Sequence, residues 1–115
     1  MAKYEKLITG NFEEVLRQID RDVSDSGISM QLVDESNYSN NNVNIAVRVY
    51  DKYFMRNGNR ASLSLTVVGN GSNIFISAIG AGGGQGVFFN FSLGAEEEMV
   101  GTVQESVERI LGRGY

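Results

Sequence analysis

Residues 61–79 read ASLSLTVVGNGSNIFISAI, the clearest strand pattern in the chain. Its alternating apolar positions are Leu63, Leu65, Val67, Ile74, Ile76 and Ala78. Strict alternation is typical of strands with one buried face. The Asn70-Gly71 pair is a favoured two-residue hairpin turn, and such a turn sets Val67 opposite Ile74. The stretch therefore predicts an antiparallel hairpin with all its apolar residues on one face.

A third strand is predicted upstream, in residues 43–50, which read VNIAVRVY. A three-residue loop over 56–58 would set Val49 opposite Leu65, whereas a two-residue loop would set it opposite Thr66 and mix the two faces. A shift of one residue moves every side chain of a strand to the other face. We therefore predict the three-residue loop, which puts the valines on the buried face.

Two amphipathic helices accompany these strands. Asn11 and Glu14 have the spacing of a capping box at the start of the first helix. Its apolar residues follow a helical period, at Phe12, Val15, Leu16, Ile19 and Val23. The last helix is predicted with residues 96–98, three glutamates, in its first turn, because the helix dipole favours negative charge there.

Weaker patterns complete the chain. Strands are predicted over residues 3–9, 28–32 and 87–91, and residues 34–42 are predicted to form a polar loop. The element order is then β-α-β5-α, in a single domain over residues 1–115. The predicted fold class is α+β, a curved antiparallel sheet with both helices packed on one face.

The composition excludes several chemistries. The chain contains no His and no Cys, which rules out imidazole or thiolate catalysis, zinc fingers and iron–sulfur clusters. The net charge of −4 argues against a nucleic-acid partner. No run of residues is apolar enough for a signal peptide or a membrane span, so a cytoplasmic protein is expected. We expect no cofactor and no metal, and the missing catalytic motifs favour a non-enzymatic role.

Two regions are candidates for binding. One is the glycine-rich segment 80–86, which fits neither the dinucleotide-binding nor the P-loop pattern. If it has no binding role, this segment is simply a hairpin loop. The other is the sheet face away from the helices, where aromatic and aliphatic residues stand among hydroxyl groups. The candidate binding residues are Arg48, Tyr50, Arg60, Thr66, Phe75, Gly82, Gly83, Gly84, Gln85 and Phe88.

Three segments carry a resemblance to a known family. They are residues 46–53, residues 58–66, and residues 77–79 leading into 83–89. Together they resemble a small bacterial family of unknown function from Firmicutes, over nearly the whole chain. The resemblance implies no activity. It implies that the family motif includes Arg48, Tyr50, Asn59, Arg60, Gln85, Phe88 and Phe89.

Two functional hypotheses follow. The first is a non-enzymatic binding or self-association module, a homodimer that pairs through the sheet face or the Phe88 region. The alternative is a small-molecule-binding protein or simple enzyme, with a pocket between the sheet and the C-terminal helix near Gln85. Any catalysis there would depend on groups such as the Arg48 guanidinium or on backbone amides.

Overall fold

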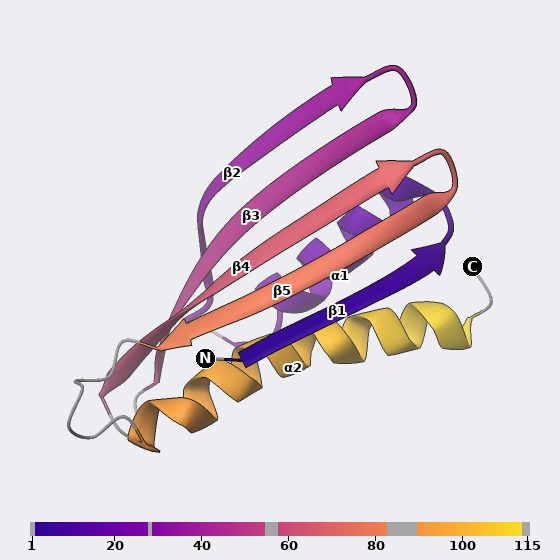
Figure 1. Cartoon of the computed structure of the whole chain (residues 1–115). Coiled ribbons are helices and arrows are strands. Elements are labelled where there is room, and N and C mark those ends of the chain that lie inside the picture. Colours follow the sequence, from indigo (N-terminus) through magenta and orange to yellow (C-terminus); the bar gives the residue numbers. More distant parts are fainter. Residues whose placement is uncertain (1, 28, 55–57, 83–89, 114–115) are drawn as a thin grey trace.

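The computed structural model describes residues 2–27, 29–54, 58–82 and 90–113. Five strands form one sheet, and two helices pack on the same side of it (Figure 1). In chain order the elements are β1 (Ala2–Thr9), α1 (Phe12–Ser24), β2 (Gln31–Asn40), β3 (Val43–Phe54), β4 (Asn59–Asn70), β5 (Asn73–Gly82) and α2 (Asn90–Gly112). The predicted α+β class, with an antiparallel sheet and both helices on one face, is confirmed.

The sheet has the strand order β1-β5-β4-β3-β2, and every neighbouring pair is antiparallel. β4 is the central strand, and β1 and β2 are the two edges, so the sheet is open. β1 reaches its place beside β5 because the chain crosses through α1 before it enters the four-strand meander β2 to β5. This order puts the first and second strands of the chain at opposite edges.

The helices bury one face of the sheet. The Asn11 side chain accepts a hydrogen bond from the Glu14 backbone N–H at 2.9 Å, which confirms the predicted helix start. The core residues of α1 are Val15, Leu16, Ile19 and Val23, as the helical period predicts. From the sheet, the residues buried against the helices include Leu63, Leu65, Val67, Ile74, Ile76 and Ala78. α2 lies across β1, β5 and β4 and also packs against α1.

Two turns differ from their predictions. In the β4–β5 hairpin Asn70 pairs with Asn73, so Gly71 and Ser72 form the turn and Val67 faces Ile76 instead of Ile74. The shift is by two residues, which preserves the faces. In the β3–β4 hairpin Phe54 pairs with Asn59, which leaves four residues between the strands instead of three. This second shift is by one residue, so it moves every side chain of β3 to the face opposite the predicted one.

The remaining differences concern weaker patterns. Residues 34–40, predicted as a polar loop, belong to β2, an edge strand exposed along its whole length. An edge strand has backbone partners on one side only and needs no buried apolar face, so alternation does not mark it. The predicted strand 87–91 falls partly on residues 83–89, which lie outside the described residues, and residues 90 and 91 begin α2. The glutamates 96–98 therefore lie beyond the first helical turn.

Candidate functional site

An apolar row crosses the sheet on the face opposite the helices. Paired residues of an antiparallel sheet point to the same side. The register therefore aligns Leu7 of β1, Phe75 of β5, Val68 of β4, Ile45 of β3 and Tyr38 of β2 in one line. Leu7 is 72% exposed and Tyr38 is 58% exposed, at the two ends of the row. All five strands thus contribute an apolar side chain to a single row.

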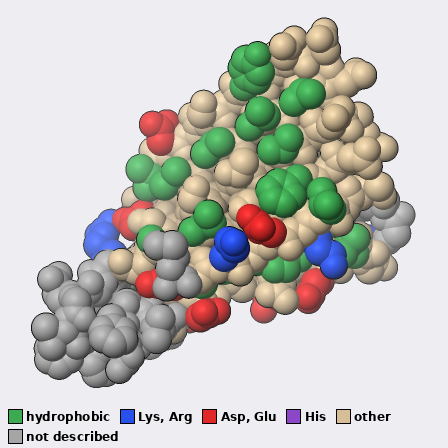
Figure 2. Space-filling model, viewed as in Figure 1, with side chains coloured by type: hydrophobic (Ala, Val, Ile, Leu, Met, Phe, Trp, Pro, Cys, Tyr) green, Lys and Arg blue, Asp and Glu red, His purple; other side chains and the backbone are tan. Residues whose placement is uncertain are grey.

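We call this surface the open face. Among the described residues both helices pack on the other side, and Figure 2 shows hydrophobic side chains spread over it. Its second row runs Glu5, Ser77, Thr66, Val47 and Ser36, and its third runs Lys3, Ile79, Ser64, Val49 and Asp34. Val47 and Val49 line a shallow hollow of about 150 Å³ beside β2.

Among the described residues, the charged side chains of the open face come from its edges and ends. From residues 43–49, 62–68 and 73–79 of the three inner strands, this face receives only apolar, hydroxyl and amide side chains. Lys3 and Glu5 stand on the β1 edge, where the Glu5 carboxylate accepts a hydrogen bond from Ser77 Oγ of β5 at 3.2 Å, and Asp34 stands on the β2 edge. An uncharged centre with a polar rim is the usual anatomy of a protein–protein interface.

The inversion of β3 corrects the predicted placement of two candidate site residues. Arg48 and Tyr50 do not face outward; they lie on the helix side, where Arg48 is 8% exposed and Tyr50 is fully buried. The valines take the open face in their place, because the four-residue spacing between β3 and β4 pairs Val49 with Ser64. The predicted pairing of Val49 with Leu65 is therefore wrong.

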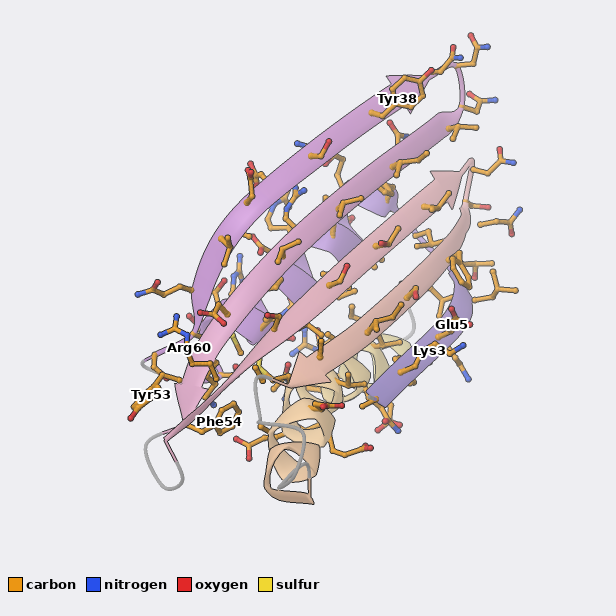
Figure 3. All side chains as sticks on the ribbon, turned by 60° about the vertical axis from the view of Figure 1, so that its left-hand side comes forward. Lys3, Glu5, Tyr38, Tyr53, Phe54 and Arg60 are labelled. Atoms are coloured by element: carbon orange, nitrogen blue, oxygen red, sulfur yellow. The ribbon has the colours of Figure 1, made fainter. Side chains whose placement is uncertain are left out.

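Other predicted site residues keep their places. Thr66 lies near the centre of the open face, and Phe75 belongs to its apolar row. Arg60, at the start of β4, also points to this side and forms an ion pair with Asp51 of β3 (Figure 3). Gly82 ends β5, and its backbone N–H donates to Glu96 Oε1 at 2.9 Å. Gly83, Gly84, Gln85 and Phe88 lie outside the described residues.

The helix side of β3 holds a polar cluster. The Tyr50 hydroxyl donates to the Asp20 carboxylate of α1. Arg48 Nη1 donates to Asn37 Oδ1 at 2.9 Å, and Arg48 Nε lies 3.1 Å from Glu35 Oε1. Burial, followed by the hydrogen bond to the carboxylate, raises the pKa of Tyr50 well above its ordinary value of 10.0. The phenol therefore stays protonated and acts as a structural donor between α1 and the sheet.

A second polar network joins the two helices. Asp22 of α1 accepts hydrogen bonds from Ser106 Oγ at 2.6 Å and from Gln18 Nε2 at 3.0 Å, and Arg109 Nη2 lies 3.2 Å away. Burial acts to raise the pKa of Asp22, but these donors outweigh it and hold the pKa below 3.8. The cleft of about 500 Å³ beside them is lined by Asp22, Asp25, Ser26, Glu98, Gly101, Thr102, Glu105 and Arg109.

This cleft is not the pocket of the small-molecule hypothesis. It lies between the helices, whereas the hypothesis needs a pocket between the sheet and α2. At Gly80 the strand packs tightly on that helix, since a Cβ there would lie 2.9 Å from the Glu96 backbone oxygen. Among the described residues, no three acidic side chains are arranged to hold a metal ion. No described helix is long and apolar enough to cross a bilayer.

Comparison with known proteins places the chain in a family. The sequence pattern of DUF6054, a family of unknown function, matches residues 1–111. The chain belongs to this family. The predicted resemblance to a family of unknown function is thereby confirmed at this level, and DUF6054 brings no activity to transfer. No curated protein and no solved structure matches the chain significantly.

Sequence reasoning missed most of the apolar residues of the open face. The missed members are Leu7, Tyr38, Val43, Ile45, Val47, Val49 and Val68. One signal was available: β3 carries two alternating sets, and Tyr50 and Ala46 fit a buried face as well as the valines do. Whether the loop between β3 and β4 has an odd or an even number of residues decides which of the two sets faces the helices.

Proposed function

We propose that this protein is a non-enzymatic self-association module that pairs through the open face. The observation that carries the proposal is the apolar row from Leu7 to Tyr38, which spans all five strands. Exposed apolar surface of this extent is unfavourable in water unless a partner covers it. The uncharged inner strands and the charged rim support a protein as that partner.

The proposal is tested by a substitution at the centre of the open face. Thr66 lies in the second row on the central strand and is partly exposed, so a lysine there has room in the monomer. In an associated state the same lysine would be desolvated against an apolar surface. Gln104→Lys is the matched control, because it adds the same charge on the exposed side of α2.

Sedimentation velocity at high micromolar concentration provides the measurement. We expect the wild type and Gln104→Lys to sediment as dimers and Thr66→Lys as a folded monomer, with folding checked by circular dichroism. A monomeric wild type would overturn the proposal. A Thr66→Lys dimer as strong as the wild type would overturn it as well, because association would then use another surface.

Three further proposals concern the location, the source and the domain organisation of the protein. We place the protein in the cytoplasm of a bacterium, within Firmicutes, and treat residues 1–115 as one domain. The bacterial origin is what the resemblance described in the sequence analysis implies. The missing Cys fits a reducing compartment. Partners other than a second copy, including small molecules, are secondary candidates.

A further inference from the structure

The open face has complementary charges at its opposite edges. The third row begins with Lys3 on β1 and ends with Asp34 on β2, and uncharged side chains lie between them. In Figure 3 the β1 residues Lys3 and Glu5 lie across the sheet from Tyr38 of β2. A surface with a cation at one edge and an anion at the other can complement itself in a symmetric pair.

We infer that two copies stack their open faces about a two-fold axis that runs close to parallel with β4, which places Lys3 against the partner's Asp34. This inference rests on the proposed self-association and specifies its geometry. β4 is the central strand, so a rotation about it exchanges β1 with β2 and β5 with β3. Positions along the strands are preserved, and each row therefore meets the same row of the second copy.

The apolar residues match in this arrangement. Leu7 lies over the partner's Tyr38, Phe75 lies over the partner's Ile45, and Val68 meets its own equivalent on the axis. Two sheets that pack face to face keep their strands within about 30° of each other, which this axis allows. The apolar row is therefore covered along its whole length by an apolar row.

The other in-plane axis fits less well. A two-fold axis perpendicular to the strands and centred on the second row lays β1 over β1. That places Glu5 beside the partner's Glu5 and sets the apolar row over the row that starts at Lys3. Like charges facing each other oppose association. Charge and apolar pattern therefore both favour the axis along β4.

The available area is adequate for a homodimer. Beyond the apolar row lies a fourth row, made of Thr9, Asn73, Asn70, Val43 and Asn40. Five strands at about 4.8 Å spacing and four rows at about 7 Å spacing give a projected area of roughly 600 Å² per chain. Side chains that stand out of the sheet add to this accessible area. A standard interface buries about 800 Å² per partner, so the open face approaches what a specific complex requires.

Charge reversal tests the arrangement. By symmetry the dimer contains two Lys3–Asp34 contacts, so reversing one residue of the pair creates two repulsions. We expect Lys3→Glu alone and Asp34→Lys alone to weaken dimerisation about tenfold in sedimentation equilibrium at low salt. The double variant restores wild-type affinity. An equimolar mixture of the two single variants forms a heterodimer, since each reversed charge then meets an opposite one.

Matched controls separate the local contact from net charge. Lys6→Glu reverses a charge on the same strand, on the helix side of the sheet, and Glu105→Lys reverses one on the exposed side of α2. Both controls keep wild-type affinity under the inference. Equal weakening by the controls, or no rescue in the double variant and the mixture, would overturn it.

The same experiment distinguishes this inference from the proposed function. One outcome is that the wild type dimerises, Thr66→Lys is monomeric and both charge-reversal variants dimerise like the wild type. That outcome overturns the axis along β4 but leaves self-association through the open face intact. A wild type that stays monomeric overturns both. Tight heterodimers of the two single variants, formed where neither variant dimerises well alone, support both.

Discussion

The link between the two helices gives a quantitative prediction for Ser106→Ala. Ser106 is fully buried, and its hydroxyl donates to the Asp22 carboxylate at 2.6 Å. Loss of a hydrogen bond to a charged group costs about 1.5–3 kcal/mol. Alanine favours the helix over serine by roughly 0.5 kcal/mol. We therefore expect Ser106→Ala to lower the free energy of unfolding by about 1–2.5 kcal/mol at pH 7.

The pH dependence of this loss identifies its cause. The pKa of Asp22 is lower in the folded protein than its ordinary value of 3.8. The carboxylate therefore contributes its full stabilisation above pH 3.8, and the contribution is lost as the pH falls through the folded pKa. Because Ser106 acts through this carboxylate, the difference between the wild type and Ser106→Ala is expected to shrink in acid.

Urea denaturation followed by circular dichroism measures the difference at pH 7 and at about pH 2.5. Both proteins are compared at one fixed concentration, because association shifts apparent stability. Asp22→Asn is the second substitution of a double-mutant cycle, and in the Asp22→Asn background we expect Ser106→Ala to lower the free energy of unfolding by less. An unchanged free energy of unfolding at pH 7, or the same cost in the Asp22→Asn background, would refute the argument.

Two further predictions concern packing against the sheet. Tyr50→Phe removes the hydroxyl that donates to Asp20 and is expected to cost about 1–3 kcal/mol in urea denaturation; unchanged stability would contradict a structural role. Gly80→Ala places a Cβ 2.9 Å from the Glu96 backbone oxygen and is expected to cost about 1–3 kcal/mol. Its control is Gly101→Ala in α2, where a Cβ meets nothing within 4 Å and about 1 kcal/mol of stabilisation is expected. A Gly80→Ala protein as stable as the wild type would show that α2 packs on β5 differently.

Local patterns predicted most of the architecture. The capping box at Asn11 and the apolar period of α1 specify that helix without help from the rest of the chain. In β4 and β5 the alternation is strong enough that a two-residue change of register leaves the faces intact. Such features depend on neighbours in sequence, which is why sequence alone is sufficient to find them.

The open face depended on features that no local pattern contains. From the sequence alone, Tyr50 and Arg48 are expected to be exposed because they are polar. In the fold, Asp20 of α1 accepts a hydrogen bond from the Tyr50 hydroxyl, and Glu35 of β2 pairs with Arg48. These partners come from other elements, and they make the polar set of β3 suitable for burial. The valines are then left outside. The strand character of β2 was hidden for a related reason, since its backbone pairs with β3 while its side chains stay exposed.

Spin labels report the contact between two open faces itself. The chain has no Cys, so a single cysteine at Ser64 carries one nitroxide, and a cysteine at Gln104 on α2 serves as the control. Two open faces stacked about an axis along β4 hold the backbones at position 64 roughly 10 Å apart, the usual spacing of packed sheets. At high micromolar concentration we expect strong spin–spin broadening for the label at 64 and narrow lines for the label at 104. Narrow lines at 64 would rule out pairing of the open faces about β4, and broadening at 104 alone would show association through α2 instead of the open face.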